Sequence, residues 1–310
     1  NPICNTNGSA IHLFKRKQQM CKIDILMATY NGEAYLAQQL RSLQNQTFRE
    51  WELLIHDDGS SDKTIDIIRS FAKEDKRIKI IEDGIRFSCS ELNFMHLLKF
   101  STSSYIAFCD QDDIWLENKL QEMYNIISSS DIQIPQAVYC NSYVYDTGAA
   151  LISGHTTICH PHKLKDMLFM NGGIQGCAIM FNASLREICN NQPEIIAMHD
   201  HLITMAALTF GKLSYIDKRL MLYRRHQNTV TGRTFRNKSE KVTPFFNRNK
   251  TVLSPKHYDA TISFYNKYQS IIPDKQKKIF NDFFKFTKEN KLKRICHIIY
   301  GGYNLYDTKL

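Results

Sequence analysis

The residues best suited to chemistry in this sequence are three aspartates that follow a short apolar run. Residues 105–109 (Tyr-Ile-Ala-Phe-Cys) are rich in aromatic and β-branched side chains and too few for a helix, so they predict a strand buried on both faces. Asp110, Asp112 and Asp113 come directly after this strand. Because ligands bind beyond the carboxyl ends of strands in open parallel sheets, we expect a binding site here.

Carboxylates so close together repel one another unless a cation joins them. Hard oxygen ligands suit Mg²⁺ or Mn²⁺, which also bind substrate phosphates. The cluster therefore predicts a divalent metal ion that holds a phosphorylated substrate. A structural interpretation fits these residues equally well when they are taken alone, with Asp112 or Asp113 capping a helix that begins near Leu116.

Length and composition set broader limits. The 310 residues suffice for one large α/β core with an accessory region, or for two modest domains. The net charge of +9, with Lys and Arg crowded toward the carboxyl end, indicates an anionic partner such as a nucleotide, a nucleic acid or a membrane surface. Nine cysteines without a Cys-x-x-Cys pair indicate free thiols in a reducing compartment. No apolar run reaches about 18 residues and the first residues are too polar for a signal peptide, so we expect a cytoplasmic protein.

From residue 22 onward, strand patterns alternate with helix patterns. Apolar runs predict strands at residues 23–27, 51–55 and 77–81 before the acidic strand, and apolar residues at helical spacing follow each of them. Repeated β-α units predict an α/β fold with a parallel sheet and right-handed crossovers. Further strands are expected at 137–145 and 213–222.

The second predicted strand also ends in carboxylates. Gly59 permits a tight turn after Asp57 and Asp58, and Ser61 or Asp62 can cap the next helix. A turn role and a ligand role fit Asp57 equally well. For Asp58, at a strand's carboxyl end, the position favours a ligand role.

Four segments, in order and at matching spacing, resemble the signature blocks of the family 2 glycosyltransferases, whose nucleotide-sugar-binding fold is called GT-A. They are residues 28–33, 46–48, 57–62 and 108–115. The resemblance covers residues 22–223 and is densest in the first half of that range. It implies a Rossmann-like, mostly parallel mixed sheet flanked by helices. Within the family, the chain is most similar to bacterial enzymes that build cell-surface polysaccharides, including rhamnosyltransferases.

The resemblance implies a nucleotide site. Ala28 and Tyr30 lie where the family cradles the base, in the block that ends at Glu33, and Asp58 lies where a carboxylate accepts a hydrogen bond from the pyrimidine imide. A carboxylate there favours uracil or thymine, because cytosine offers no N3 donor. The expected donor is thus a UDP- or dTDP-sugar, and nucleic acid is not an expected partner.

The resemblance also assigns the metal. Asp110 and Asp112 match the family's Asp-x-Asp, with Asp112 as the main ligand of Mn²⁺ or Mg²⁺ and Asp110 toward the ribose and the metal. Arg86 and Asn93 fall in a segment that often contacts the nucleotide or its phosphates, although a surface role fits Arg86 equally well.

Asp200 is the expected catalytic base. It resembles the aspartate of the family's Glu-Asp or His-Asp motif, which takes the proton from the acceptor hydroxyl. The implied reaction is a single displacement that inverts the anomeric centre, and the metal neutralises the leaving pyrophosphate, so no protein acid is needed. Helix capping is the structural alternative for Asp200.

Two later segments complete the expected site. Gly176 lies in a glycine-rich loop that the family places near the transferred sugar and the acceptor. His226, next to Arg224 and Arg225, belongs to a segment similar to Tyr-Arg-x-His in related transferases and would reach the pyrophosphate, although surface cations fit the pattern equally well. Four metal-type residues nearby match no standard zinc spacing and predict no zinc site: His155, Cys159, His160 and His162.

The expected organisation has four parts. Residues 1–21 form an N-terminal extension, 22–230 the catalytic domain, 231–255 a mobile basic loop that orders over substrate, and 256–310 a basic amphipathic helical region. The helical region either packs on the catalytic domain or docks on the anionic inner face of the plasma membrane. Docking there would suit a glycan acceptor that is lipid-linked, as is common in this enzyme class.

Two other classes of protein deserve comparison. A haloacid-dehalogenase-type phosphatase also has a strand that ends in Asp-x-Asp, which would make Asp110 a nucleophile. Such a domain begins with that strand and has Thr or Val where Ile114 stands, so the order of elements disfavours it. A non-catalytic nucleic-acid-binding protein would explain the charge, but no signature of one appears.

Overall fold

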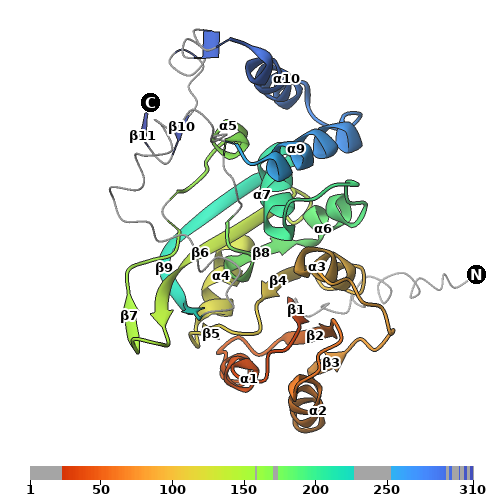
Figure 1. The fold of residues 1–310 in the computed structure, drawn as a ribbon, viewed down its shortest axis with the longest axis vertical. Helices are drawn as coiled ribbons and strands as arrows, with labels where there is room; N and C mark the ends of the chain where they lie inside the picture. Colours follow the sequence, from red (N-terminus) through yellow and green to blue (C-terminus); the bar gives the residue numbers. More distant parts are fainter. Residues whose placement is uncertain are drawn as a thin grey trace, which may run out of the picture.

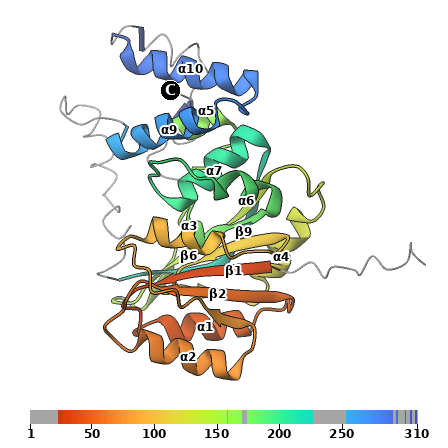
Figure 2. The same cartoon turned by 90° about the vertical axis from the view of Figure 1, so that its right-hand side faces the viewer.

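The computed structural model describes residues 23–157, 159–169, 174–226 and 253–290, together with 293, 294, 300, 304, 305, 308 and 309. Within these residues, nine strands form one mixed sheet in the order β3-β2-β1-β4-β8-β6-β9-β5, with β7 paired to β6 (Figure 1). The sheet is the middle layer, and helices cover both of its faces (Figure 2). The predicted α/β class is confirmed.

The first half of the sheet is parallel. β1 (Ile23–Thr29) lies between β2 (Trp51–Asp57) and β4 (Tyr105–Cys109), and β3 (Ile78–Ile80) pairs with β2. All four strands were predicted, but β2 runs past residue 55 and β3 is shorter than expected. Since Thr29 is level with Asp57 and Met27 with Cys109, the carboxyl ends of β1, β2 and β4 meet at one edge.

The second half of the sheet is mixed. β8 (Ile179–Asn182) is antiparallel to both β4 and β6 (Gln136–Asp146), while β9 (Lys212–Arg225) runs parallel to β6. A short strand, β7 (Leu151–Ser153), forms a hairpin with β6. The predicted strands at 137–145 and 213–222 are thus confirmed with slightly longer bounds.

The segment after the acidic cluster differs from the prediction. Ile114 and Trp115 form a strand, β5 (Ile114–Trp115), that pairs with β9, and helix α4 (Lys119–Ile127) begins only after its N-cap residue Asn118. Neither Asp112 nor Asp113 therefore caps a helix. The capping interpretation of these two aspartates is wrong.

Two apolar cores, one on each face of the sheet, hold the helices. One core includes buried side chains from α1 (Leu36–Gln44), α2 (Thr64–Glu74) and α4. The other receives side chains from α3 (Ser90–Leu98), α5 (Leu164–Leu168), α6 (Ala183–Asn190) and α7 (His199–Phe210). Strand residues alternate between the cores, as Leu26 faces one while Ile25 and Met27 face the other.

The carboxyl-terminal region contains the expected helices, α9 (Pro255–Tyr268) and α10 (Asp274–Lys288). Their aromatic side chains, Phe264 and Phe280 among them, are buried in the same core as α3 and α7, so this region packs on the catalytic domain. Beyond it, β10 (Asn304–Leu305) pairs with β11 (Thr308–Lys309). Of the helices described, none combines the length and apolar character needed to span a membrane. The predicted extension at 1–21 and residues 231–252 of the predicted loop lie outside the described residues.

Gly211, between α7 and β9, provides a test of this packing. A methyl group on Gly211 would overlap the carbonyl oxygen of Pro135, a backbone atom that already accepts a hydrogen bond from the Lys212 amide. We expect Gly211→Ala to lower the free energy of unfolding by about 2 kcal/mol in urea denaturation. Gly148→Ala, where a methyl group meets only ordinary contact, is the control. Equal stability of the two variants would contradict this packing.

Candidate active site

The acidic loop after β4 carries more negative charge than its surroundings neutralise. Asp113 is fully buried; one carboxylate oxygen accepts a hydrogen bond from the Arg224 amide (3.0 Å), whereas the other has no hydrogen-bond partner. Burial and the charges of Asp110 and Asp112 raise the pKa of Asp113 well above its usual range. Burial, and next the charge of Asp112, raise the pKa of Asp110 to about 6. A cation at this loop would relieve the repulsion.

The buried amine of Lys119 partly balances the negative charge of the acidic loop. Lys119 is 1% exposed; its Nζ donates to the carbonyl oxygen of Cys177 and lies 3.5 Å from the centre of the Trp115 ring. The positive charge of Lys119 lowers the pKa of Asp110, against the larger effect of burial. Lysine is seldom buried without a charged partner, so this residue is a structural counterion of the acidic loop.

The side chains available to a metal ion differ from the predicted pair. Oxygens of Asp110 and Asp113 and the sulfur of Cys177 all lie within 4.8 Å of one another. Burial and the nearby carboxylates raise the pKa of Cys177, so the thiol is protonated and the carboxylates are the hard ligands. Asp112, the predicted main ligand, instead accepts a hydrogen bond to Oδ2 from His226 Nε2 (2.8 Å). The unpartnered oxygen of Asp113 and the raised pKa values fit a divalent cation.

The end of β9 closes over this loop. Arg224 is 4% exposed, and its guanidinium donates to the carbonyl oxygen of Asp112 (2.6 Å) and to Gln38 Oε1 (2.6 Å). It also lies over the ring of Tyr35, which His226 contacts at 4.8 Å. Arg224 thus holds the acidic loop, while His226 sits beside Asp112, where the sequence expects the pyrophosphate.

Asp57 and Asp58 have different surroundings. Asp57 accepts hydrogen bonds from Thr29 Oγ1 (2.9 Å), from the Gly59 amide (3.0 Å), and from the amide and hydroxyl of Ser60, so it builds the turn. Asp58 accepts one hydrogen bond, from the Phe87 amide. Gly59 has φ +85°, and a side chain there would overlap the guanidinium group of Arg86. Asp58 and Arg86 therefore lie on the same side of this turn.

The loop after β1 is tied to the neighbouring loops. The Gln111 amide group pairs with both the N–H (3.0 Å) and the C=O (2.9 Å) of Tyr30, whose side chain remains 58% exposed. The Glu33 carboxylate accepts from the Lys63 amide, and the Glu33 amide donates to Asp62 (both 3.0 Å). Tyr30 is placed to meet a ligand beside the half-buried Ala28, whereas Glu33 is occupied in joining two loops.

Asp200 lies in the first turn of α7, within electrostatic range of Asp110. Its carboxylate accepts hydrogen bonds from the amides of His201 (2.6 Å) and Gly176. Burial, and to a lesser degree the charge of Asp110, raise its pKa to about 7. The N-cap of α7 is Met198, so the capping alternative for Asp200 is not realised.

Asn93 and Gly176, two predicted binding residues, both make close contacts with other residues of the protein. Asn93 is 1% exposed and its amide group bonds to His56, so its side chain is turned toward β2. A methyl group on Gly176 would overlap Nε2 of His199, which is buried against Phe94 and Phe108. Gly176 thereby fixes how closely the first turn of α7 approaches the short helix η1 (Gly176–Ala178).

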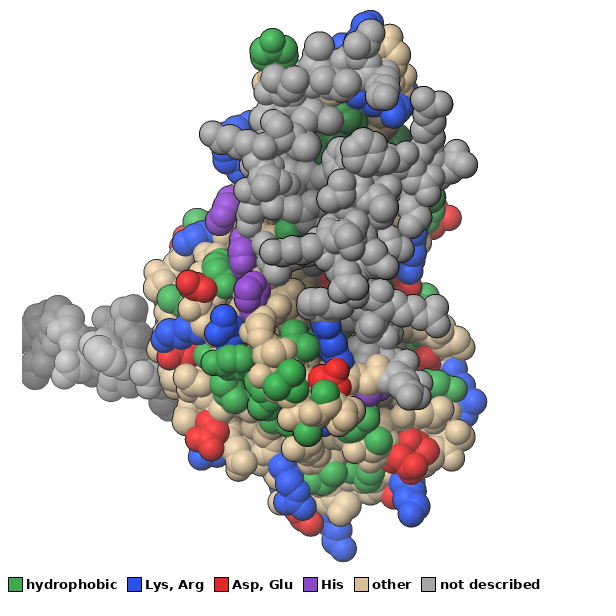
Figure 3. All heavy atoms as spheres, turned by 60° about the vertical axis from the view of Figure 1, so that its left-hand side comes forward, with side chains coloured by type: hydrophobic (Ala, Val, Ile, Leu, Met, Phe, Trp, Pro, Cys, Tyr) green, Lys and Arg blue, Asp and Glu red, His purple; other side chains and the backbone are tan. Residues whose placement is uncertain are grey.

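A separate hollow lies on β6 and β9. It has a volume of about 590 Å³, and His160 stacks there on Tyr215 at 4.0 Å and hydrogen-bonds to the Tyr139 hydroxyl. Figure 3 shows histidine side chains in a row on one face, with basic and hydrophobic side chains below them. Within the described part of the chain, His155, Cys159, His160 and His162 belong to none of the groups of side chains that could hold a metal ion.

This fold and site define a class of protein. The sheet, parallel in one half and mixed in the other, carries an acidic loop at its strand ends and a half-buried aspartate in the first turn of α7, an arrangement that suits nucleotide-sugar glycosyltransferases of the GT-A fold. The glycosyl transferase family 2 model matches residues 24–190, and the chain belongs to that family.

Relatives and solved structures agree with this assignment. The chain is 28% identical over 220 residues to the dTDP-rhamnosyl transferase RfbG of Shigella flexneri, covering 66% of this chain and 73% of RfbG. It is 32% identical over 117 residues to the Escherichia coli glucosyltransferase WfgD, covering 38% of this chain and less than half (45%) of WfgD. The full name of WfgD is UDP-Glc:alpha-D-GlcNAc-diphosphoundecaprenol beta-1,3-glucosyltransferase.

The same fold occurs in two solved glycosyltransferase structures. Residues 1–349 of Staphylococcus aureus TarS, in complex with UDP, superpose with a TM-score of 0.58 at 15% identity, covering 90% of this chain and 78% of that one. The mannosyltransferase PcManGT of Pyrobaculum calidifontis, in complex with GDP-Man and Mn²⁺, gives 0.54 at 14% identity, covering 84% and 68%. The predicted fold and family are confirmed.

A substitution at Gly176 tests how the site positions Asp200. We expect Gly176→Ala to displace His199 and the first turn of α7, and so to lower kcat by about 100-fold while nucleotide-sugar binding changes little. Steady-state kinetics and calorimetric titration measure the two quantities, with Gly148→Ala as control. Unchanged kcat would contradict a positioning role for this close contact.

Proposed function

We propose that this chain is an inverting glycosyltransferase that moves a sugar from a UDP- or dTDP-sugar to a hydroxyl group of a glycan acceptor in bacterial cell-surface polysaccharide synthesis. The observation that carries the proposal is the pairing of a carboxylate cluster with Asp200, a second carboxylate whose pKa is raised to about 7. Two carboxylate centres with different environments suit two tasks, cation binding and proton transfer.

Asp200 is the proposed base. A pKa near the working pH lets a carboxylate accept a proton readily and yet be ionised in much of the population. In the proposed step the acceptor hydroxyl gives its proton to Asp200 while its oxygen bonds to the anomeric carbon, and the bond from that carbon to the nucleoside diphosphate breaks. The amides of His201 and Gly176 orient the carboxylate for this transfer.

Asp110, which belongs to the group that could hold a metal ion, and Asp112, which would exchange its contact with His226 for the cation, are the proposed ligands of Mn²⁺ or Mg²⁺. When bound, this cation supplies charge neutralisation for the leaving diphosphate. The carboxylate oxygen of Asp113 that has no hydrogen-bond partner supports the binding of a cation at this loop. His226, which now bonds to Asp112, is placed to exchange that contact for a phosphate oxygen.

The donor's base is proposed to lie against Ala28 and Tyr30, with Asp58 accepting from its imide N–H. Asp58 uses one hydrogen bond for the Phe87 amide, and a carboxylate can accept several. Arg86, exposed beside Gly59, is proposed to meet the nucleotide or its phosphates. The similarity to RfbG and WfgD, whose names specify a dTDP-sugar and UDP-Glc, supports a pyrimidine nucleotide.

The acceptor is proposed to be lipid-linked. WfgD, which the chain resembles over part of its length, is named for a diphosphoundecaprenol acceptor. We further propose that the lysines exposed on α10, Lys275 and Lys285 among them, face an anionic membrane surface when such an acceptor is engaged. The family match disfavours the phosphatase alternative, in which Asp110 would be a nucleophile.

Replacing the proposed base separates binding from turnover. We expect Asp200→Asn to bind the donor nucleotide normally but to lower kcat by at least about 100-fold, because the amide cannot take the proton. Isothermal titration and a sugar-transfer assay measure these quantities, and Glu194→Ala, a change at an exposed carboxylate, is the control. Near-normal turnover in Asp200→Asn would refute the assignment.

The pH dependence of kcat follows from the same residue. Asp200 must be ionised to act as base, and its pKa is raised to about 7, so we expect kcat to rise with pH until about 7 and then to level. Below that range most of the population is protonated and inactive. A pH–rate profile measured at saturating donor and metal tests this, and a profile flat from pH 5 to 8 would speak against it.

Nucleotide preference and metal dependence can be measured by thermal stabilisation. We expect UDP or dTDP with Mn²⁺ to raise the Tm by about 5 °C at saturation, more than GDP or CDP with the same cation. The rise should vanish without metal and in Asp112→Ala, but persist in Glu194→Ala. A metal-independent rise would overturn the assigned cation role, and an equal rise with CDP would overturn the role of Asp58.

A further inference from the structure

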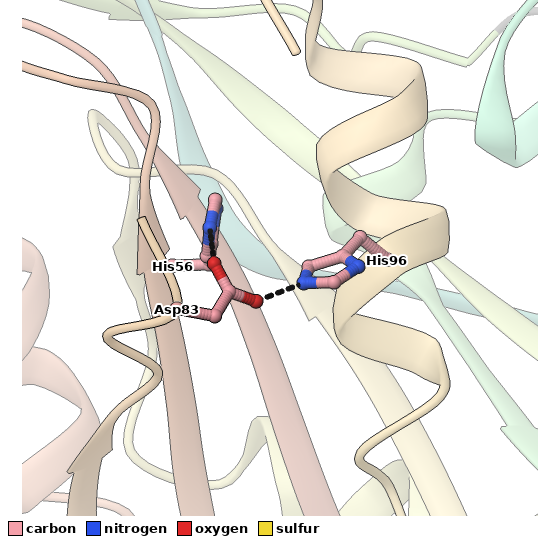
Figure 4. A group of neighbouring side chains, drawn as sticks. All are labelled: His56, Asp83 and His96. Atoms are coloured by element: carbon pink, nitrogen blue, oxygen red, sulfur yellow. Dashed lines mark hydrogen bonds and ion pairs between the residues drawn. The ribbon is translucent and has the colours of Figure 1, made fainter. Parts of the chain in front are cut away.

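A second cluster of metal-type side chains lies at the carboxyl end of β2, apart from the acidic loop (Figure 4). His56 comes from β2, Asp83 from the link between β3 and α3, and His96 from α3. The Asp83 carboxylate lies between the two imidazoles, with Oδ1 at 3.2 Å from His56 Nε2 and Oδ2 at 2.5 Å from His96 Nε2. One ligand atom from each of the three residues lies within 4.8 Å of the others.

Asn93 fixes which nitrogen of His56 carries the proton. Its Nδ2 donates to the carbonyl oxygen of His56 (3.3 Å), so its Oδ1 must face the imidazole and accept from His56 Nδ1 (2.8 Å). His56 Nδ1 is therefore protonated. In the neutral imidazole the lone pair of Nε2 would then point toward a carboxylate oxygen, which is also an acceptor.

Two acceptor atoms at 3.2 Å require something positive between them. His56 is almost fully buried, and the hydrogen bond from the Ile85 amide lowers the pKa of Asp83, which favours its carboxylate form. A metal ion bound by both atoms would satisfy this contact.

We propose that Nε2 of His56, Nε2 of His96 and the carboxylate of Asp83 bind a divalent transition-metal ion of the Zn²⁺ type. Two imidazoles and one carboxylate form a common zinc ligand set that leaves the fourth position to water. Metal–ligand distances of about 2.0–2.1 Å in a tetrahedron put ligand atoms about 3.3 Å apart. The distance from His56 Nε2 to Asp83 Oδ1, 3.2 Å, is close to this value, whereas His96 Nε2, now 2.5 Å from the other oxygen Oδ2, would have to move away from the carboxylate on metal binding.

The surroundings match those of a zinc ligand. His56 donates its other ring N–H to an amide oxygen, the kind of outer contact that orients metal-binding histidines. The Phe87 ring lies 4.9 Å from the His96 ring and the Phe100 ring lies 5.1 Å from it, so aromatic contacts hold the His96 imidazole, while the exposed Asp83 leaves the site open to a cation. The imidazole ligands distinguish this site from the all-oxygen site expected to take Mn²⁺ or Mg²⁺.

The site's position gives it a structural effect. Asp83 belongs to the same short link as Phe87, whose amide binds Asp58, and as Arg86, which contacts Gly59. A cation that joins this link to β2 and α3 would hold those contacts in place. That consequence rests on the proposed function, because Asp58 is the proposed base-reading residue, whereas metal binding itself does not.

Co²⁺ binding to the full chain tests the proposal without any activity measurement. The experiment uses Asp110→Asn/Asp112→Ala as background, which removes both proposed ligands of the other centre and one member of the group formed by Asp110, Asp113 and Cys177. We expect about one equivalent of Co²⁺ to give the visible absorption of a tetrahedral site with nitrogen ligands, and Zn²⁺ to displace it. Adding His96→Gln or Asp83→Asn should weaken binding by more than about 100-fold, since loss of even an outer-shell partner costs 10–100-fold.

His162→Gln, a change at an exposed histidine outside the cluster, is the matched control and should bind Co²⁺ as the background does. Circular dichroism verifies that each variant is folded, and either folded cluster variant decides the test. Unchanged Co²⁺ absorption in His96→Gln or Asp83→Asn would overturn the proposal. So would the absence of stoichiometric binding. Failure of sugar transfer would affect neither result.

Discussion

The constraint on which the rest of the structure depends is the burial of negative charge beyond β4. Asp110 and Asp113 have raised pKa values, and Asp200 nearby has one as well. Burying a charge costs several kcal/mol unless it is paired, so the loop needs partners from all sides. Lys119 provides a buried positive charge beneath it, and Arg224 binds its backbone from above. The proposed divalent cation would balance the negative charge that these two residues leave.

Local pattern predicted the parallel half of the fold because each β-α unit there is nearly self-contained. Strands buried on both faces read as continuous apolar runs, and short loops join them to amphipathic helices. The prediction failed just after the acidic loop, where Ile114 and Trp115 pair with Leu222 and Met221 of β9. Nothing in a two-residue apolar segment indicates a partner so distant in the chain. The capping interpretation of Asp112 and Asp113 failed for that reason.

The candidate site residues also divide into those that a local pattern indicates and those that depend on contacts between distant segments. Asp58, Asp110 and Asp200 could be singled out because an aspartate after an apolar strand, or at a helix start, stands out by type and position. Gln111 and Lys119 could not, because their roles come from what they meet: the Tyr30 backbone in one case and a buried carbonyl in the other. Glu33 and Asn93 were singled out from family segments, but their side chains bond within the protein. The Glu33 carboxylate accepts from the Lys63 amide, and the Asn93 side chain bonds to His56. The type of a residue predicts which contacts its side chain is able to make, and the tertiary structure decides which of them it makes.

The coupling between Asp110 and Asp200 bears on the direction of the proposed reaction. In the proposed reaction, a divalent cation and the diphosphate of the donor would nearly neutralise each other, so the bound donor would change the pKa of Asp200 little. Transfer of the sugar would leave a nucleoside diphosphate with more negative charge than the donor had. That charge would favour the protonated form of Asp200 just after it had taken the acceptor's proton, which would disfavour return of the proton. Release of the diphosphate with its cation would remove this effect and make the base ready for the next acceptor.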